Sequence, residues 1–202
     1  MTRVLRPAFF TAFFAAAVAT ATTGCGGGGA LDNPDTVANP PGGSGQKLSF
    51  AYFQRCVFPV LNTPLKVNIG GVITTNTCAA GGCHDNSTGT GGALRLLAAA
   101  PPVNMALPVA TVKASDMYKN YYSSLGESVV GGADDSRLLN KPLVRNTLHG
   151  GGLIFETVDD DAAKRIRYWI NHPMPSGQDE FSSASNSLFT PPDAALGTCN
   201  ID

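Results

Sequence analysis

Two thiols and an imidazole lie close together near the middle of the chain, in Cys78-Ala79-Ala80-Gly81-Gly82-Cys83-His84. This spacing is related to the Cys-x-x-Cys-His pattern of covalent haem attachment, in which both thiols bond to the haem and the histidine binds its iron. Four small residues separate the cysteines here, where the usual pattern has two, and they allow the backbone to curl against a flat ring. We predict that Cys78 and Cys83 attach one haem c and that His84 is its proximal ligand.

Three other interpretations of the two cysteines stay open at this point. They are a zinc half-site, a disulfide between Cys78 and Cys83, and thiols without a function in a loop. The regular two-residue spacing carries the strong haem signal, so the widened spacer alone does not decide among these interpretations.

The N-terminus has the pattern of a bacterial export signal over residues 1–24. Arg3 and Arg6 precede an apolar run from Phe9 to Ala21, which is too short to span a membrane comfortably. The small residues before Cys25 resemble the cleavage site of bacterial lipoproteins, which implies a lipid anchor on Cys25 in the periplasm or at the cell surface. Thr22 stands where lipoproteins usually have an aliphatic residue, so cleavage without lipid attachment remains an alternative.

Export also bears on the chemistry of the other cysteines. In an oxidising compartment thioethers and disulfides are favoured over a reduced zinc-thiolate site. If Cys25 carries lipid and Cys78 and Cys83 carry haem, then Cys56 and Cys199 are left as a possible disulfide pair.

The chain that remains after residue 24 has 178 residues and a formal charge of −3, because Arg3 and Arg6 are lost from a chain of net charge −1. It is long enough for one domain and not basic enough for nucleic acid, which is not expected as a partner. Residues 25–46 are rich in glycine and proline without an apolar period, which predicts a flexible, disordered tether. We therefore divide the chain into a signal peptide (1–24), a lipid-anchored tether (25–46) and one domain (47–202).

Most of the domain is expected to form helices joined by long loops. The first helix begins after Ser49 and is ended or kinked by Pro59. Residues 62–77 predict a short hairpin or a loop insertion. Further helices are expected from Ser115, over 136–141, and over 160–170, the last capped by Thr157 or Asp159 with an apolar face of Ile166, Trp169 and Ile170.

His149 is the second histidine with a pattern of interest. Three glycines, Gly150 to Gly152, follow it and let the backbone approach a flat ligand while the imidazole points toward it. The glycine-rich segment 89–92 lacks the Gly-Lys-Ser/Thr of a phosphate-binding loop, and no nucleophile elbow is present. Phosphate binding and triad hydrolysis are therefore not supported.

Several strings resemble class I type cytochrome c domains of exported bacterial proteins when they are taken in order. They are Phe53-x-x-Cys56-Val57-x-Pro59-Val60-Leu61, Cys83-His84-Asp85, Gly91-Gly92-Ala93-Leu94-Arg95-Leu96, Ser136-Arg137-Leu138-Leu139-x-Lys141-Pro142-Leu143, His149-Gly150-Gly151-Gly152 and Tyr168-Trp169-Ile170. Each string alone is weak, and their fixed order over residues 48–171 is more specific. The widened spacer of the haem motif and the insertion at 62–77 depart from the family pattern.

The resemblance implies an all-α, cytochrome c-like helical domain in which one haem lies between the first and last helices. The second axial ligand of such domains lies on a loop before the last helix, and His149 occupies that place. Met174 is the runner-up, since methionine is the commoner ligand. Met105 lies in a proline-flanked loop, and Met117 is expected in the core. Arg95 has the charge to pair with a haem propionate, although a solvated charge is an equal alternative.

The expected function is electron transfer by a monohaem c-type cytochrome lipoprotein, with redox proteins as partners and a lipid anchor at the membrane. A haem held by the protein on both faces exchanges electrons without binding a substrate, so an electron carrier is preferred over an enzyme. One alternative is a peroxidase-like enzyme or a sensor with an open distal site. The other is a lipoprotein without haem, in which Cys78 and Cys83 form a disulfide.

Overall fold

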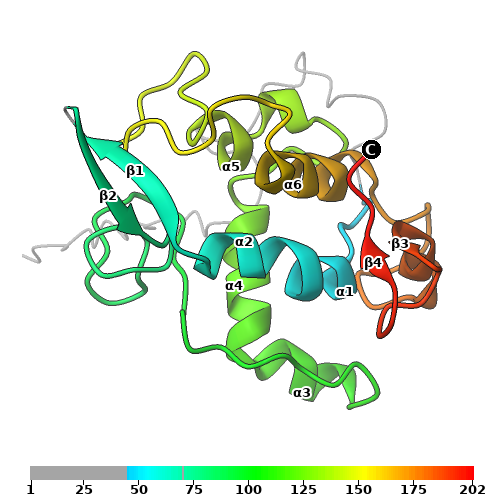
Figure 1. Cartoon of the computed structure of the whole chain (residues 1–202). Helices are drawn as coiled ribbons and strands as arrows, with labels where there is room; N and C mark the ends of the chain where they lie inside the picture. Colours follow the sequence, from blue (N-terminus) through cyan, green and yellow to red (C-terminus); the bar gives the residue numbers. More distant parts are fainter. Residues whose placement is uncertain (1–44, 70) are drawn as a thin grey trace, which may run out of the picture. The chain divides into compact units, whose positions relative to one another are not determined.

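The structure is a computed structural model that describes residues 45–69 and 71–202 (Figure 1). In chain order its elements are α1 (Phe50–Tyr52), η1 (Phe53–Val57), α2 (Phe58–Asn62), β1 (Leu65–Ile69), β2 (Val72–Asn76), α3 (Val109–Ala114), α4 (Asp116–Leu125), η2 (Ala133–Asp135), α5 (Arg137–Asn140), α6 (Asp161–Asn171), η3 (Ser183–Leu188), β3 (Phe189–Thr190) and β4 (Thr198–Cys199).

The signal peptide, Cys25 and nearly all of the tether lie outside the described residues. Among the residues that are described, no helix has the length and apolar character needed to cross a membrane.

The elements α1, η1 and α2 form one continuous helical segment. Ser49 caps it, as predicted, by accepting a hydrogen bond from the Tyr52 backbone N–H at 3.1 Å. The segment does not end at Pro59. A π-helical turn, η1, ends at Val57, so that Pro59 is the second residue of α2, in a first turn where its missing N–H is tolerated.

The helix α4 begins after Ser115, as predicted, with the Ser115 hydroxyl accepting from the Tyr118 N–H at 3.1 Å. The helix α6 is capped by Asp160, whose carboxylate accepts from the Ala162 N–H at 3.1 Å. The predicted caps Thr157 and Asp159 are therefore wrong, and Asp160 is the residue whose extended backbone places a carboxylate over the first turn.

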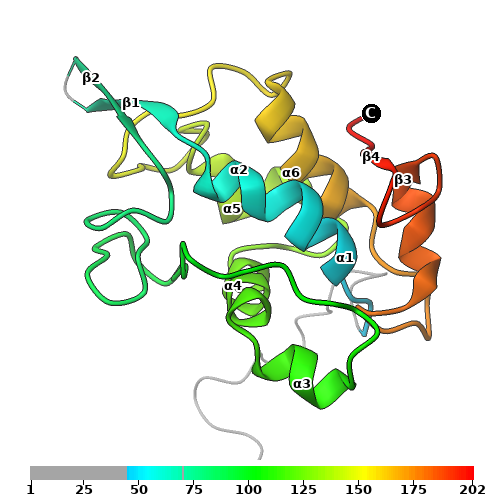
Figure 2. The same ribbon diagram turned by 60° about the horizontal axis from the view of Figure 1, so that its bottom comes forward.

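The first helical segment packs between α4 and α6, as both ribbon views show (Figures 1 and 2). The predicted apolar face of α6 is fully buried, with Trp169 packed at 5.3 Å between ring centroids from Phe53. The Trp169 Nε1–H donates to the Ser49 carbonyl at 2.9 Å, and the Tyr121 hydroxyl donates to the Leu48 carbonyl at 2.7 Å. The core thus supplies hydrogen-bond partners for the polar atoms of its largest aromatic side chains.

The all-α expectation is wrong, because the described residues also contain two antiparallel two-stranded sheets. In the first sheet β1 pairs with β2 from Leu65↔Asn76 to Ile69↔Val72, which confirms the hairpin alternative for residues 62–77. The physical reason is local: β-branched residues favour an extended backbone, and Gly71 takes a positive φ of 88° at the turn. In the second sheet β3 pairs with β4 next to the C-terminus.

Cys56 and Cys199 form a disulfide with a Cα–Cα distance of 5.9 Å, as the sequence predicted. Cys56 lies in η1 and is 1% exposed, whereas Cys199 lies in β4. The disulfide therefore fastens the C-terminal segment to the first helical segment.

Candidate functional site

The candidate site is a cavity of about 380 Å³ lined by residues from seven parts of the chain. Cys78, Cys83, His84 and His149 all face it, so the four principal residues singled out from the sequence lie around one space. The remaining walls come from Leu61 at the end of α2, from β1, from the segment 90–94, from Glu127, from α5 with the residues that follow it, and from the segment after His149. In Figure 1 the loop after β2 and the loop before α6 lie on the same side of the helices as the hairpin.

The backbone N–H and the backbone carbonyl of His84 both form hydrogen bonds. Its N–H donates to the Cys78 carbonyl at 2.9 Å, and its carbonyl accepts from the Leu96 N–H at 2.7 Å. The first bond closes the loop between the two cysteines, and the second joins His84 to the extended segment 94–96. The imidazole is therefore attached to a backbone that is fixed at both ends.

Each of the two cavity histidines has one ring nitrogen occupied by a backbone carbonyl. His84 Nδ1 lies 3.2 Å from the Leu94 oxygen, and His149 Nδ1 lies 2.8 Å from the Gly152 oxygen. A carbonyl oxygen only accepts hydrogen bonds, so this arrangement favours the tautomer that carries the proton on Nδ1. Nε2 then keeps its lone pair, which is the state in which histidine binds a metal.

The environment of His84 also favours its neutral form. Burial lowers the pKa of His84 below its ordinary value, and the positive charges of Lys141 and Arg95 act in the same direction, while the hydrogen bond to Leu94 opposes them. A neutral imidazole at physiological pH is available as a ligand.

The two imidazoles are separated by a distance that fits one metal atom. Their ring centroids are 6.3 Å apart and their planes differ by 10°. A metal bonded to one nitrogen of each ring at about 2.0 Å would place the centroids about 6 Å apart. The described residues contain no group of three or more His, Cys, Asp or Glu side chains that could hold a metal ion, so any metal here needs further ligands from a bound group.

The thiols of Cys78 and Cys83 are both free and partly exposed to the cavity. Burial raises the pKa of Cys78 to about 11, with a smaller contribution from the neighbouring Cys83. Cys78 is therefore a protonated thiol at neutral pH when no partner is bound to it.

Arg95 does not line the cavity that contains the two histidines. It lines a second cavity of about 530 Å³, together with Lys113, Lys119 and Tyr122, where the chain packs beside α4. Its Nη1 atom is buried without a hydrogen-bond partner in the described part of the chain.

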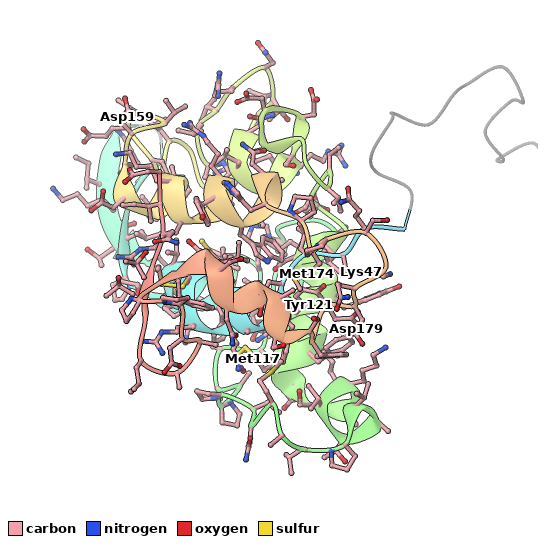
Figure 3. The ribbon with its side chains drawn as sticks, turned by 90° about the vertical axis from the view of Figure 1, so that its right-hand side faces the viewer. Lys47, Met117, Tyr121, Asp159, Met174 and Asp179 are labelled. Carbon is pink, nitrogen blue, oxygen red and sulfur yellow. A yellow bond between two sulfur atoms is a disulfide. The ribbon has the colours of Figure 1, made fainter. Side chains whose placement is uncertain are left out.

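The methionines are likewise outside the lining of the site. Met174 is 1% exposed, and its N–H donates to the Lys47 carbonyl at 2.7 Å, so that the two residues lie side by side (Figure 3). Met117 is buried in the core on α4, and Met105 packs against the core. The structure thus brings His149, and none of the weighed methionines, opposite His84.

Two cations that were quoted in the resemblance but given no role there line the cavity. Arg137 is the first residue of α5, and Lys141 directly follows that helix. Residues four apart lie on the same face of a helix, and both residues line the cavity. Neither forms a salt bridge within the described residues, although Glu127 is a third charged residue in the lining. The Arg-x-x-x-Lys spacing was a usable signal, because a helix aligns residues four apart.

Comparisons of the chain with protein-family models, with curated proteins and with solved structures gave no match. Function is therefore inferred from the residues of this chain.

Proposed function

We propose that the cavity between His84 and His149 binds one haem, held covalently by Cys78 and Cys83, which makes the chain a haem protein. The observation that carries this proposal is the pair of imidazoles at 6.3 Å in a cavity that also contains two free thiols. Both histidines have Nδ1 occupied by a carbonyl, so that their Nε2 atoms are available to the iron. Arg137 and Lys141 supply positive charge for two propionate carboxylates.

Within that class, the chain is proposed to be a monohaem c-type cytochrome. When bound, the haem iron supplies a one-electron redox centre. The chain's own part is to hold an imidazole on each side, to fix the ring through two thioethers and to surround it with apolar walls such as Leu61, Leu94 and Ile154. Because His84 and His149 would both bind the haem, electron transfer is favoured over reaction with a substrate.

The same proposal includes export from the cytoplasm, which the pattern of the N-terminal sequence supports. Export through residues 1–24 would deliver the chain to a compartment in which the Cys56–Cys199 disulfide is stable. A lipid on Cys25 would anchor it to a membrane, and redox proteins would be its partners.

The test is the mass and the pyridine haemochrome spectrum of the full chain produced with a bacterial c-type haem maturation system. The wild-type chain is expected to carry the mass of one haem and to show the haemochrome after denaturation. Cys83→Ala and His84→Ala are expected to lose stable haem, whereas His172→Ala is the matched control because His172 is exposed and bonds to Tyr168 on its own helix. A wild-type chain with the mass of the polypeptide alone would reject the proposal.

A further inference from the structure

The β1–β2 hairpin touches the segment that carries the distal histidine. Asn68 of β1 and Leu153 form an isolated antiparallel bridge, although they are far apart in the sequence. Both ribbon views show the segment that leads to α6 passing beside the hairpin (Figures 1 and 2). The hairpin therefore has a structural partner beyond its own two strands.

The point of contact is adjacent to the turn that orients His149. The Gly152 N–H donates to the His149 carbonyl at 2.9 Å, while the Gly152 carbonyl lies 2.8 Å from His149 Nδ1. Gly152 has a positive φ of 71°, a conformation that glycine adopts without strain. Leu153 follows directly, so the bridge to Asn68 fixes the end of this turn.

On its C-terminal side the distal segment is anchored in the core by Phe155, which is 1% exposed. The apolar side chains on either side of the turn are more exposed. Leu148 is 90% exposed and Leu153 is 44% exposed, so neither side chain is anchored in the core. On the far side of the turn, the N–H groups of Ile154 and Phe155 donate to the Pro142 carbonyl at 2.8 and 3.2 Å. The turn is thus held between the end of the α5 region and the hairpin.

We propose that the β1–β2 hairpin is the positioning element of the distal histidine, which keeps the His149 imidazole opposite His84. This inference rests on the proposed haem site and assigns a role to a segment that departs from the cytochrome pattern. Asn68 and Leu153 act through the backbone, and neither side chain is assigned a contact with the haem. Loss of the contact lets the distal segment move away more often, so that small ligands reach the iron from that side.

The structure offers a variant that removes the contact and leaves the cavity walls in place. Val67 and Thr74 are register partners, so replacing residues 68–73 by Asn-Gly joins them through a two-residue hairpin turn. Leu65 and Val67, which line the cavity, and Asn76 are retained. The removed tip carries Val72 and Ile73, which are 65% and 66% exposed and contribute little to the core.

The matched control keeps the hairpin length and changes only the exposed apolar residues, as Val72→Thr with Ile73→Thr. Carbon monoxide binding to the reduced holoprotein reports how often the distal ligand leaves the iron. We expect binding to be about fivefold or more faster in the shortened variant and unchanged in the control, in line with the loss of one backbone contact. Equal rates in the shortened variant and the wild type would overturn the inference.

A second readout does not depend on haem. In the haem-free chain, amide hydrogen exchange over residues 149–154 is expected to accelerate in the shortened variant and to stay unchanged in the control. Unchanged exchange would also overturn the inference. If the wild type takes up no haem, the proposed function fails, while the exchange experiment still decides whether the hairpin positions this segment.

Discussion

Gly91 shows how closely the backbone approaches His84. A methyl group added at Gly91 would lie 2.5 Å from both Cε1 and Nδ1 of the His84 ring and 2.7 Å from the Cys83 carbonyl oxygen. Glycine is required at this position because no other residue leaves space for the imidazole. The glycine-rich segment 89–92 therefore approaches the His84 ring directly.

We predict that Gly91→Ala displaces the His84 ring and destabilises the fold by about 1–3 kcal/mol, the usual cost of overpacking. Haem content and the unfolding free energy from denaturant titration are the measurements. Gly126→Ala is the matched control, because an added methyl group there meets only the Ser123 carbonyl oxygen at 3.4 Å and Gly126 does not line the cavity. Equal haem content and stability in both variants would contradict the contact described for Gly91.

His149 is the residue whose removal tests the ligand opposite His84. We predict that His149→Ala keeps its covalent haem but changes from a low-spin to a high-spin spectrum and binds carbon monoxide in the reduced state. Met174→Leu is expected to keep the wild-type spectrum, because Met174 is buried beside Lys47 and does not line the cavity. A low-spin spectrum that persists in His149→Ala and is lost in Met174→Leu would transfer the ligand role to Met174.

At the scale of elements, the short helix α5 delivers two charges to the cavity. Arg137 and Lys141 lie one helical turn apart, whereas Arg145 further along pairs with Asp134 at 3.2 Å on the exposed surface. Arg137 and Lys141 therefore line the site, whereas Arg145 does not. Positive charge next to a redox centre stabilises its reduced form, because reduction adds negative charge.

We therefore predict that Arg137→Ala and Lys141→Ala lower the reduction potential of the haem, each by on the order of 10 mV for a partly screened charge. The shift should diminish as ionic strength rises. Arg145→Ala is the control and should leave the potential unchanged. Potentiometric titration measures all three variants, and a potential that rises in Arg137→Ala and Lys141→Ala would contradict their placement as partners of the carboxylates.

For the molecule as a whole, the Cys56–Cys199 disulfide closes a loop with a sequence separation of 143 residues. In the chain-entropy description, a crosslink over so long a loop strongly lowers the conformational entropy of the unfolded chain. The disulfide also holds β4 against the first helical segment, on which α4 and α6 pack. It therefore contributes to the stability of the entire described domain.

We predict that Cys56→Ala combined with Cys199→Ala lowers the unfolding free energy by about 2–5 kcal/mol. The haem spectrum should remain that of the wild type, because neither cysteine lines the cavity. Denaturant unfolding measures the change, and the reduced wild-type chain is the control that should match the double variant. A loss of less than about 1 kcal/mol would show that the C-terminal segment is held mainly by other contacts.

The sequence by itself determined the features that depend on local spacing and on chemical type. The grouping of Cys78, Cys83 and His84, the Ser115 cap and the buried face around Trp169 follow from neighbours in the chain and from helical periodicity. The disulfide partners were found by elimination, since the other cysteines had been assigned to lipid and haem.

Only the tertiary structure decided which distant residues share the cavity. It brings His149 opposite His84, moves Arg95 to another cavity and adds Arg137 and Lys141 to the lining. It also shows two small sheets where an all-α domain was expected. In the β1–β2 hairpin, β-branched residues around the Gly71 turn favour paired strands. The physical reason is that local propensity acts over a few residues. Which side chains from separate loops lie opposite one another depends on how the whole core packs.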